Sequence, residues 1–324
     1  MKGVILMQKL LHKYESYVKE LDDLIIKETY SEYDVLNTVI FDLVRSGGKR
    51  LRPLLMNLSG KFGGEYNQEK ILKVAPALEI LHMATLVHND IIDDARLRRG
   101  TRSAQKKFGK NIAVFCGDYL LSQSFNIFVQ HLPQEPLLKL SNIIKSICLG
   151  EIGQYLNKYN PDITFKQYLR RIRRKTAILF AFSTYLGAYL SGIRGKRLNY
   201  LYKIGMEIGM TFQIQDDLLD FSGKKEKLGK DIGKDLKEGI YTLPIICILQ
   251  EEKEKVYPVL KKEKISQDEF DFILNLVKEK GIKESRKIMK KFQDKVYYYL
   301  DLLPDKIVKD DLKLIIEIQF NRKY

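Results

Sequence analysis

The chain has 324 residues, of which 45% are hydrophobic, so it can bury a full core and global disorder is excluded. Its three cysteines, Cys116, Cys148 and Cys247, are far apart and odd in number, which argues against a disulfide framework and a zinc site. The net charge of +15 raises the question of nucleic-acid binding, but no nucleic-acid-binding motif accompanies the scattered basic residues. We therefore predict no nucleic-acid partner; an anionic small substrate or an anionic lipid surface explains the charge more simply.

The N-terminal segment 1–7 holds too short an apolar run for a signal peptide, and no run of about 18 apolar residues occurs in the chain. The sequence therefore predicts a cytoplasmic protein that spans no membrane. Peripheral contact with a membrane is compatible with the basic composition.

Apolar residues recur every three to four positions, the period of an amphipathic helix, in the segments 8–26, 33–45, 71–95, 111–131, 137–158, 165–191, 198–221 and 286–302. Glycine and proline signals separate them, at 46–48, 63–65, 99–100, 132–136, 160–161, 192–195, 222–223 and 303–304. Strand-like alternation between tight turns is missing. We predict an all-α fold, a single domain over 1–324 with its helices around a central cavity, in which the more charged 251–285 forms a peripheral helical excursion.

Two aspartate-rich stretches dominate the sequence, Asn89-Asp90-Ile91-Ile92-Asp93-Asp94 and Asp216-Asp217-Leu218-Leu219-Asp220. Side chains four residues apart on a helix project from one face, so each stretch can chelate divalent cations. Apolar neighbours embed both stretches, and buried carboxylates are costly unless they are paired or bind a metal. Two such faces opposed across a cavity, with Arg98 and Arg99 beside one, predict a site for Mg²⁺ and a diphosphate.

The helix that carries the first stretch predicts an apolar channel. Counting back from Asn89, the small residues Thr85 and Ala84 come first, and the bulky Leu81 and Leu78 follow. A long apolar substrate can pass along such a face. Close packing against another helix is the alternative explanation of the two small residues.

A similar face precedes the second stretch, where Gly205 and Gly209 lie on the same side of the helix as Gln213, Asp216 and Asp220. Small residues again lead towards carboxylates.

Several single basic residues have simpler explanations. Arg50 and Arg96 are interpreted as surface charges, and His88 as a structural histidine. His82 would, on its own, also be a satisfied core histidine, but its position shortly before the first aspartate-rich stretch favours substrate binding.

Taken in order, these motifs resemble those of the trans-isoprenyl diphosphate synthases (polyprenyl synthetases). The resemblance covers about residues 30–324. Its further matches are Gly47-Gly48-Lys49-Arg50-Leu51-Arg52-Pro53, which is similar to the family's isopentenyl diphosphate motif, Glu79-Ile80-Leu81-His82 through Arg98-Arg99-Gly100, Gly117-Asp118-Tyr119-Leu120-Leu121, Gly150-Glu151 with Gln154, Lys175-Thr176, and Gly239 with Thr242-Leu243-Pro244. The resemblance implies an isoprenoid-synthase-type helical fold, usually homodimeric, with several Mg²⁺ ions bridging the two acidic helices through an allylic diphosphate.

The resemblance also implies roles for individual residues. Metal-binding positions correspond to Asn89, Asp93, Asp216 and Asp220, and Asp90, Asp94 and Asp217 are further candidate ligands. Neighbours of the allylic diphosphate correspond to Arg98, Lys175, Lys230 and Gln213; the cradle for isopentenyl diphosphate corresponds to Lys49, Arg52, His82 and Arg99. Mg²⁺ prefers carboxylate and phosphate oxygens, and arginine binds phosphate bidentately, so these residue types suit the roles.

The implied reaction is ionisation, condensation and deprotonation. Metal and lysine stabilise the leaving diphosphate. The carbocation is shielded by the side-chain oxygens of Thr176 and Gln213 and by the carbonyl of Lys175. Water must be excluded from the site because it would react with the carbocation. Members of the family that make short products tend to carry an aromatic residue where this chain has Ala84 and Thr85. We therefore predict an all-trans product of about C30–C40, for a quinone side chain.

Two positions depart from the family's pattern. Asn89 stands where the first aspartate is expected; its amide oxygen can bind Mg²⁺ but brings no charge, and Asp90 with Asp94 can supply an alternative pair after a modest helix rotation. Ile240 stands where the family often has lysine, so one phosphate contact is expected to be missing.

Alternatives stay open for the function. The sequence fits the catalytic subunit of a two-component heptaprenyl diphosphate synthase almost as well as a homodimer, and a shorter-chain farnesyl or geranylgeranyl synthase is a further alternative. A non-catalytic regulatory subunit would be marked by lost aspartates, of which Asn89 is the one sign. A terpene cyclase is disfavoured by the intact second stretch.

Overall fold

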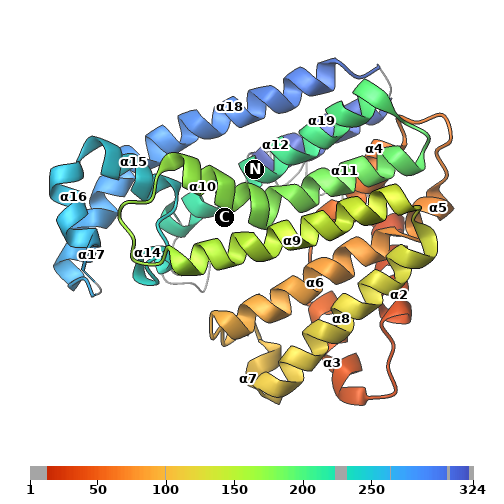
Figure 1. Ribbon diagram of the computed structural model, residues 1–324, viewed down its shortest axis with the longest axis horizontal. Helices are drawn as coiled ribbons and strands as arrows, with labels where there is room; N and C mark the ends of the chain where they lie inside the picture. Colours follow the sequence, from red (N-terminus) through yellow and green to blue (C-terminus); the bar gives the residue numbers. More distant parts are fainter. Residues whose placement is uncertain (1–12, 99, 223–231, 263, 305–306, 321–324) are drawn as a thin grey trace.

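The computed structural model describes residues 13–98, 100–222, 232–262, 264–304 and 307–320 (Figure 1). Within these ranges the regular structure is helical apart from one antiparallel hairpin of β1 (Leu97–Arg98) and β2 (Thr101–Arg102), in which Leu97 pairs with Arg102. The prediction of an all-α fold is therefore confirmed.

The helices are, in chain order, α2 Glu15–Glu28, α3 Asp34–Arg45, α4 Leu51–Gly60, α5 Gln68–Leu72, α6 Ala75–Ile92, α7 Ala104–Phe108, α8 Lys110–His131, α9 Gln134–Leu156, α10 Phe165–Ile172, α11 Ile178–Leu190, α12 Gly195–Ser222, α14 Lys234–Lys237, α15 Leu243–Glu251, α16 Lys253–Leu260, α17 Gln267–Leu276, α18 Ile282–Asp301 and α19 Ile307–Phe320. Two π-helical turns, η1 (Arg173–Ala177) and η2 (Val277–Gly281), join α10 to α11 and α17 to α18. Each predicted helical segment coincides with at least one helix. The sequence analysis missed α4 and α15 because they are buried almost all round and carry no polar stripe. It also did not identify the short helices α5, α7 and α14 or the C-terminal helix α19.

Buried apolar side chains form two clusters. The larger joins α2 to α6, α8, α9, α11 and α19 with the first half of α12. The smaller joins α10 and α14 to α17 with the second half of α12 and the start of α18. Because α12 runs from one cluster into the other, with α11 and α18 packed along it, the second aspartate-rich stretch lies within the smaller cluster (Figure 1).

Glycines on α12 allow the close approach of α11. A Cβ atom at Gly205 would lie 2.3 Å from Thr184 Oγ1, and one at Gly209 would lie 2.5 Å from Ala177 Cα. The small residues that precede the second aspartate-rich stretch therefore serve helix packing, which brings α12 against the turn that carries Lys175 and Thr176.

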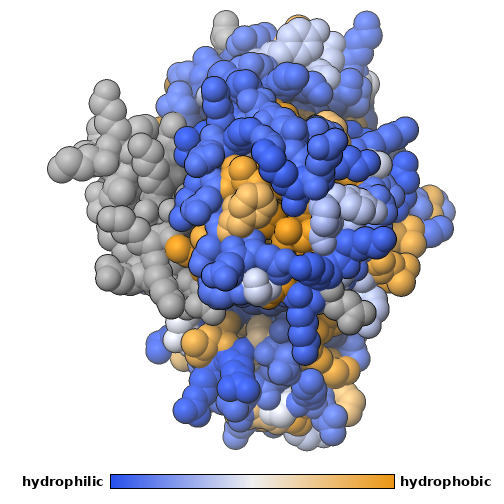
Figure 2. All heavy atoms as spheres, turned by 90° about the vertical axis from the view of Figure 1, so that its left-hand side faces the viewer, coloured by the Kyte–Doolittle hydropathy of each residue, from blue (hydrophilic) through white to orange (hydrophobic). Residues whose placement is uncertain are grey.

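The charged region 251–285 contains α16, α17 and η2, at one end of the molecule (Figure 1). Figure 2 views this end and shows a mostly hydrophilic surface around a small hydrophobic area. Leu260, Ile273 and Val277 are nonetheless fully buried in the smaller cluster, so this end packs into the body of the protein. The boundaries of the single domain stay a prediction.

Two helical stretches, Gln68–Ile92 and Lys110–His131, are long and apolar enough to cross a membrane by length and composition alone. The first belongs to the core, with 72% of its apolar window buried, whereas only 39% of the second is buried. Length and composition do not separate a membrane span from a helix that packs against protein. Helix α8 therefore exposes apolar side chains, among them Phe115 and Val129, that the core of the protein does not cover.

Arg50 is buried, which corrects the interpretation of this residue as a surface charge. Its side chain donates hydrogen bonds from Nε to Asp22 Oδ1 (2.6 Å), from Nη1 to Glu79 Oε1 (3.2 Å) and from Nη2 to the carbonyl of Val44 (2.9 Å). Glu79, on α6, is itself only 5% exposed. The arginine thus ties α2 and α6 to the start of α4, beside the isopentenyl diphosphate motif.

We expect the substitution Arg50→Met to destabilise the protein by about 3–5 kcal/mol, because it leaves the buried carboxylate of Glu79 without its hydrogen-bonded cation. Urea denaturation followed by circular dichroism measures this loss. Arg96→Met, at an exposed arginine, is the control and should change stability by less than about 0.5 kcal/mol. Equal effects of the two substitutions would contradict the role of Arg50.

Candidate active site

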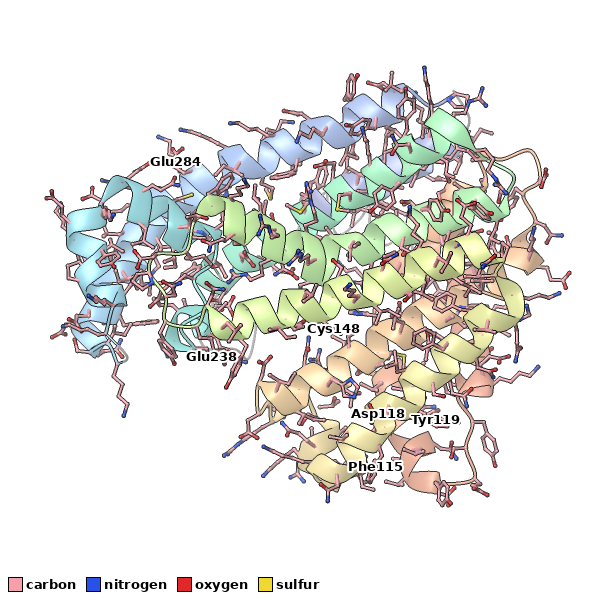
Figure 3. All side chains as sticks on the ribbon, in the orientation of Figure 1. Phe115, Asp118, Tyr119, Cys148, Glu238 and Glu284 are labelled. Atoms are coloured by element: carbon pink, nitrogen blue, oxygen red, sulfur yellow. The ribbon has the colours of Figure 1, made fainter. Side chains whose placement is uncertain are left out.

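The two aspartate-rich stretches meet at one cavity of about 140 Å³, here called the central cavity. Its lining comes from the end of α6, from α9, α10, η1, α12 and α14, and from the segment before α15: Asp93, Gln154, Arg171, Ile172, Lys175, Gln213, Asp217, Lys234, Asp235, Glu238, Ile240 and Thr242. Figure 3 labels Glu238, on the α14 side of this cavity. The structure therefore brings together Asp93, Asp217, Lys175 and Gln213, which the sequence places far apart.

The first aspartate-rich stretch lies where α6 ends. Asn89 is in the last turn, and the backbone N–H of Asp93 donates to the carbonyl of Asn89 over 2.9 Å, so the helical spacing of the two residues persists. Asp94 then adopts a positive φ of 45°, and the N–H of Ala95 bonds to the carbonyl of Asp90. This sharp turn directs the chain into the β1–β2 hairpin.

The side chains of Asp90 and Asp94 do not line the central cavity, and each lies beside a basic side chain. Asp90 is 5% exposed and accepts both Nε (2.6 Å) and Nη2 (2.5 Å) of Arg98. Asp94 lies 3.2 Å from Lys110 at the start of α8, and both side chains are exposed. The geometry thus uses Asp90 to hold Arg98, whereas Asp94 forms only an exposed ion pair. Metal binding by this alternative pair stays a prediction.

Asn89 contacts a carboxylate from another helix. Its Nδ2 donates to Glu151 Oε1 over 3.3 Å, and the other oxygen of Glu151 accepts Lys175 Nζ over 2.8 Å. Lys175 also donates to Gln154 Oε1 over 3.3 Å. Glu151 and Gln154 were absent from the predicted site, although the resemblance included them; their spacing of three residues on α9, one helical turn, was the available signal.

A chain of hydrogen bonds orients Gln213. The Thr176 hydroxyl donates to Gln213 Oε1 (2.7 Å), Gln213 Nε2 donates to Asp217 Oδ1 (2.9 Å), and the buried Tyr168 hydroxyl donates to Asp217 Oδ2 (2.6 Å). Tyr168 was not predicted, since nothing in the sequence links α10 to α12. Asp217 therefore fixes the amide of Gln213, with both of its oxygens already accepting hydrogen bonds.

Lys175 and Thr176 lie in the π-helical turn η1, where the N–H of Ile178 bonds to the carbonyl of Arg173, five residues earlier. A π turn accommodates one extra residue and rotates the helix face that follows it, which is why such turns are frequent at functional sites. Here the turn lies between α9 and α12, so both Lys175 and Thr176 reach partners on neighbouring helices.

Burial raises the pKa of two carboxyl groups in the central cavity. The pKa of Asp217 rises to about 6, because burial outweighs the hydrogen bonds from Tyr168 and Gln213 and the charge of Arg171. The pKa of Asp235 rises to about 7 through burial and the negative charges of Asp217 and Glu238. Burial, and to a lesser degree neighbouring carboxylates, therefore oppose ionisation in this cavity, and a bound cation would favour the ionised forms.

Asp220 is used differently from its neighbours. Its carboxylate accepts the backbone N–H groups of Lys234 and Asp235, over 3.2 and 3.3 Å, at the start of α14. Asp220 thereby holds Asp235 beside Asp217.

Arg52 offers a buried donor. Its guanidinium lies 4.4 Å above the ring of Phe180, and its Nε is buried without a hydrogen-bond partner among the described residues. Burial lowers the pKa of Arg52 to about 10, against the opposing charges of Glu79 and Asp216, so the side chain stays protonated at neutral pH. A phosphate oxygen is the kind of acceptor that this donor lacks.

The remaining predicted residues lie as follows. Lys49 is partly exposed just before α4, and His82 is partly exposed on α6. Leu78, Leu81 and Ala84 are buried in the larger cluster, whereas Thr85 is partly exposed and donates to the carbonyl of His82 over 2.7 Å. Arg99 and Lys230 lie outside the described residues.

The residues of the central cavity fit a divalent cation that shares its ligands with a diphosphate. Among the described residues no three His, Cys, Asp or Glu side chains form a metal-binding group by themselves. Mg²⁺, however, commonly takes one or two carboxylates and completes its shell with water and substrate phosphates. Asp93 and Asp217 face the cavity from opposite motifs, and Thr242 Oγ1 is a buried polar atom there without a partner among the described residues.

The crowded carboxylates predict a pH effect on stability. At pH 8 the folded protein must bury the ionised Asp235, whose pKa is about 7, whereas at pH 4 this group is protonated in the folded state and that cost is gone. The metal-free variant Asp235→Asn should therefore be more stable than the unsubstituted protein at pH 8, with the difference disappearing by about pH 4. Thermal unfolding across this range in a chelator measures it, and a constant difference would contradict the raised pKa.

Comparison with known proteins agrees with this geometry. A family model described as polyprenyl synthetase matches residues 33–277. Heptaprenyl diphosphate synthase component 2 of Bacillus subtilis is 39% identical over 295 residues, which are 91% of this chain and 84% of that protein.

Solved structures match over nearly the full length. The crystal structure of heptaprenyl diphosphate synthase from Staphylococcus aureus superposes with a TM-score of 0.91 at 33% identity, covering 95% of this chain and 98% of that one. Polyprenyl synthase from Caulobacter crescentus, crystallised with calcium and isoprenyl diphosphate, gives 0.90 at 27% identity, covering 98% of each chain. Since the family model covers most of the chain and the relatives match it almost end to end, this protein belongs to the polyprenyl synthetase family, whose members are prenyltransferases.

Proposed function

We propose that this enzyme condenses isopentenyl diphosphate with an allylic diphosphate, head to tail, into an all-trans polyprenyl diphosphate of about C30–C40. The observation that carries the proposal is the central cavity, which Asp93 and Asp217 line from opposite motifs together with Lys175 and Gln213. The names of the relatives from Bacillus subtilis and Staphylococcus aureus, both heptaprenyl diphosphate synthases, support a long chain. The quinone side chain is the proposed destination of the product.

Mg²⁺ is the proposed cofactor. Asp93 and the Asn89 amide at the end of α6 would hold it together with Asp216, which is partly exposed on α12 next to the cavity-lining Asp217, and phosphate oxygens would complete the shell. When bound, it supplies positive charge that stabilises the leaving diphosphate. Lys175 and Arg98 would bind the same diphosphate. Both already pair with carboxylates, Lys175 with Glu151 and Arg98 with Asp90, so they are held in place before the substrate arrives.

Thr176 and Gln213 are proposed to stabilise the allylic carbocation. Because Gln213 donates to Asp217 and accepts from Thr176, its amide dipole has a fixed direction in the free protein. Dipoles that are oriented in advance stabilise developing charge without reorganisation at the moment of reaction. Isopentenyl diphosphate would bind through Lys49, Arg52 and His82, with the unpaired Nε of Arg52 as a donor to phosphate.

The exposed apolar residues of α8 and α9 support an assembly larger than one chain. These helices are joined at Leu132 and Pro133, and Figure 3 labels Phe115 on α8 and Cys148 on α9. Their exposed apolar side chains include Val114, Phe115, Phe125, Val129, Leu149, Ile152, Tyr155 and Leu156. A homodimer is the first proposal. Because the Bacillus subtilis relative is named component 2, the catalytic subunit of a two-component synthase is the second candidate.

A product assay tests the proposed activity. The purified chain is incubated with Mg²⁺, labelled isopentenyl diphosphate and farnesyl diphosphate, and product length is read after dephosphorylation. We expect a ladder ending at about C30–C40. A stop at C15 or C20 would contradict the long-chain proposal, and no product from the folded protein would favour the two-component alternative.

The proposed chain-length channel along α6 predicts the effect of one substitution. Thr85→Phe should shorten the main product to about C15–C20, because the ring would fill the space beside the partly exposed Thr85 that the growing chain needs. Thr38→Phe, at an exposed threonine of α3, is the control and should leave product length unchanged. An unchanged product from Thr85→Phe would exclude this face of α6 as the channel wall.

A further inference from the structure

The basic side chains of the central cavity are not equivalent. Among the described residues, three of them line it: Arg171 from α10, Lys175 from η1 and Lys234 from α14. Lys175 lies 2.8 Å from Glu151, and the exposed Lys234 lies 3.3 Å from Glu238. Each lysine is therefore paired with a carboxylate, which offsets its charge.

Arg171 is buried, and its hydrogen bond goes to a neutral acceptor. The residue is 8% exposed, and its Nη2 donates to the carbonyl of Tyr241 over 2.8 Å. Its Cζ lies 5.5 Å from the centre of the Tyr168 ring. A guanidinium has five N–H donors, and the bond to Tyr241 uses one of them. These contacts hold a cation in the wall of the cavity without neutralising it.

The burial of this cation is costly unless a negative charge compensates for it. Asp217 and Asp235 do so in part, because the charge of Arg171 opposes the rise in the pKa of each. A phosphate group in the cavity would compensate for it directly, since the planar guanidinium binds phosphate oxygens through two parallel N–H donors. The surroundings of Arg171 therefore suit an anion that is absent from the protein itself.

Arg171 reaches the cavity beside position 240. The Tyr241 carbonyl that it contacts follows Ile240, which is 7% exposed and lines the same cavity. The family often has lysine at this position, where the present chain has no charge. The guanidinium thus lies next to the point from which such a lysine would enter the cavity.

We propose that Arg171 binds the diphosphate of the allylic substrate, and that it supplies from α10 the positive charge that Ile240 does not supply. This inference rests on the proposed function, which provides the ligand. The proposed ligands of isopentenyl diphosphate, Lys49, Arg52 and His82, are not among the residues that line this cavity. Arg171 therefore serves one of the two substrates and not the other.

A purely structural role of Arg171 predicts a different result. If the arginine only held the segment before α15 through Tyr241, its replacement would lower stability but leave the affinity of the folded protein for an allylic diphosphate unchanged. A lysine introduced at position 240 would not restore the bond to Tyr241, but it would return a cation to the cavity. Recovery of affinity by that lysine therefore separates the two roles.

The experiment compares the unsubstituted protein with Arg171→Gln, Ile240→Lys and the double substitution. Glutamine removes the charge and keeps an N–H donor for the carbonyl of Tyr241. Isothermal titration calorimetry with Mg²⁺ measures the binding of farnesyl thiolodiphosphate, an unreactive allylic analogue, and separately that of isopentenyl diphosphate. Arg170→Gln, at the exposed neighbour on α10, is the matched control. Circular dichroism and thermal unfolding establish that each variant is folded.

We expect Arg171→Gln to weaken binding of the analogue by about tenfold or more, the loss that removal of one charge-assisted contact to phosphate produces. Binding of isopentenyl diphosphate should stay within about twofold, because its ligands lie elsewhere. The double substitution should bring the affinity for the analogue back to within about threefold of the unsubstituted protein. Arg170→Gln should change neither affinity.

Unchanged affinity of the folded Arg171→Gln variant for the analogue would overturn the inference and leave the proposed function standing. An equal loss for both diphosphates, or no recovery in the double substitution, would overturn it as well. Should the glutamine variant not fold, Arg171→Lys gives the same test: a point charge in place of the planar donor group should weaken analogue binding by about threefold, and unchanged binding would contradict the role. No binding of the analogue by the unsubstituted protein would instead count against the proposed function itself.

Discussion

The free-energy cost of placing several carboxylates in one partly buried cavity governs the arrangement of the site. Asp217 and Asp235 have raised pKa values because burial, and then repulsion from neighbouring carboxylates, disfavour their ionised forms. Arg171 and Lys175 offset part of this charge, and each is held by an acceptor on a neighbouring element. A cavity with excess negative charge is well suited to several divalent cations, whose positive charge balances both the carboxylates and a bound diphosphate.

A buried carboxylate of the cavity also orients a neighbouring side chain. Tyr168 and Gln213 donate hydrogen bonds to Asp217, which favours its ionised form. The bonds of Gln213 to Asp217 and to Thr176 fix the orientation of the Gln213 amide. A carboxylate whose oxygens both accept hydrogen bonds can direct a neighbour as well as attract a metal. The π turn η1 contributes by placing Lys175 and Thr176 where α9 and α12 can both reach them. Helix packing, through the glycines of α12, keeps this turn close.

Departures from the family's pattern are local. Asn89 donates a hydrogen bond to Glu151, and Asp90 holds Arg98 outside the lining of the central cavity. Ile240 is buried and lines the cavity where the family often carries lysine, while Arg171 on α10 brings a cation to the same cavity. A site of this kind depends on total charge and on its distribution more than on any single side chain.

The sequence by itself determined the all-helical fold, most of the long helices with a polar face, and the two motifs, because helical periodicity and four-residue spacing are local properties. It could not identify α4 or α15, which are buried on nearly all sides. Only the tertiary structure decided that Arg50 is buried, that Asp90 binds Arg98, that Glu151 meets Asn89 and that Tyr168 holds Asp217. Periodicity tells which side of a helix a residue occupies, but the partner on that side comes from a distant element and is set by how the helices pack.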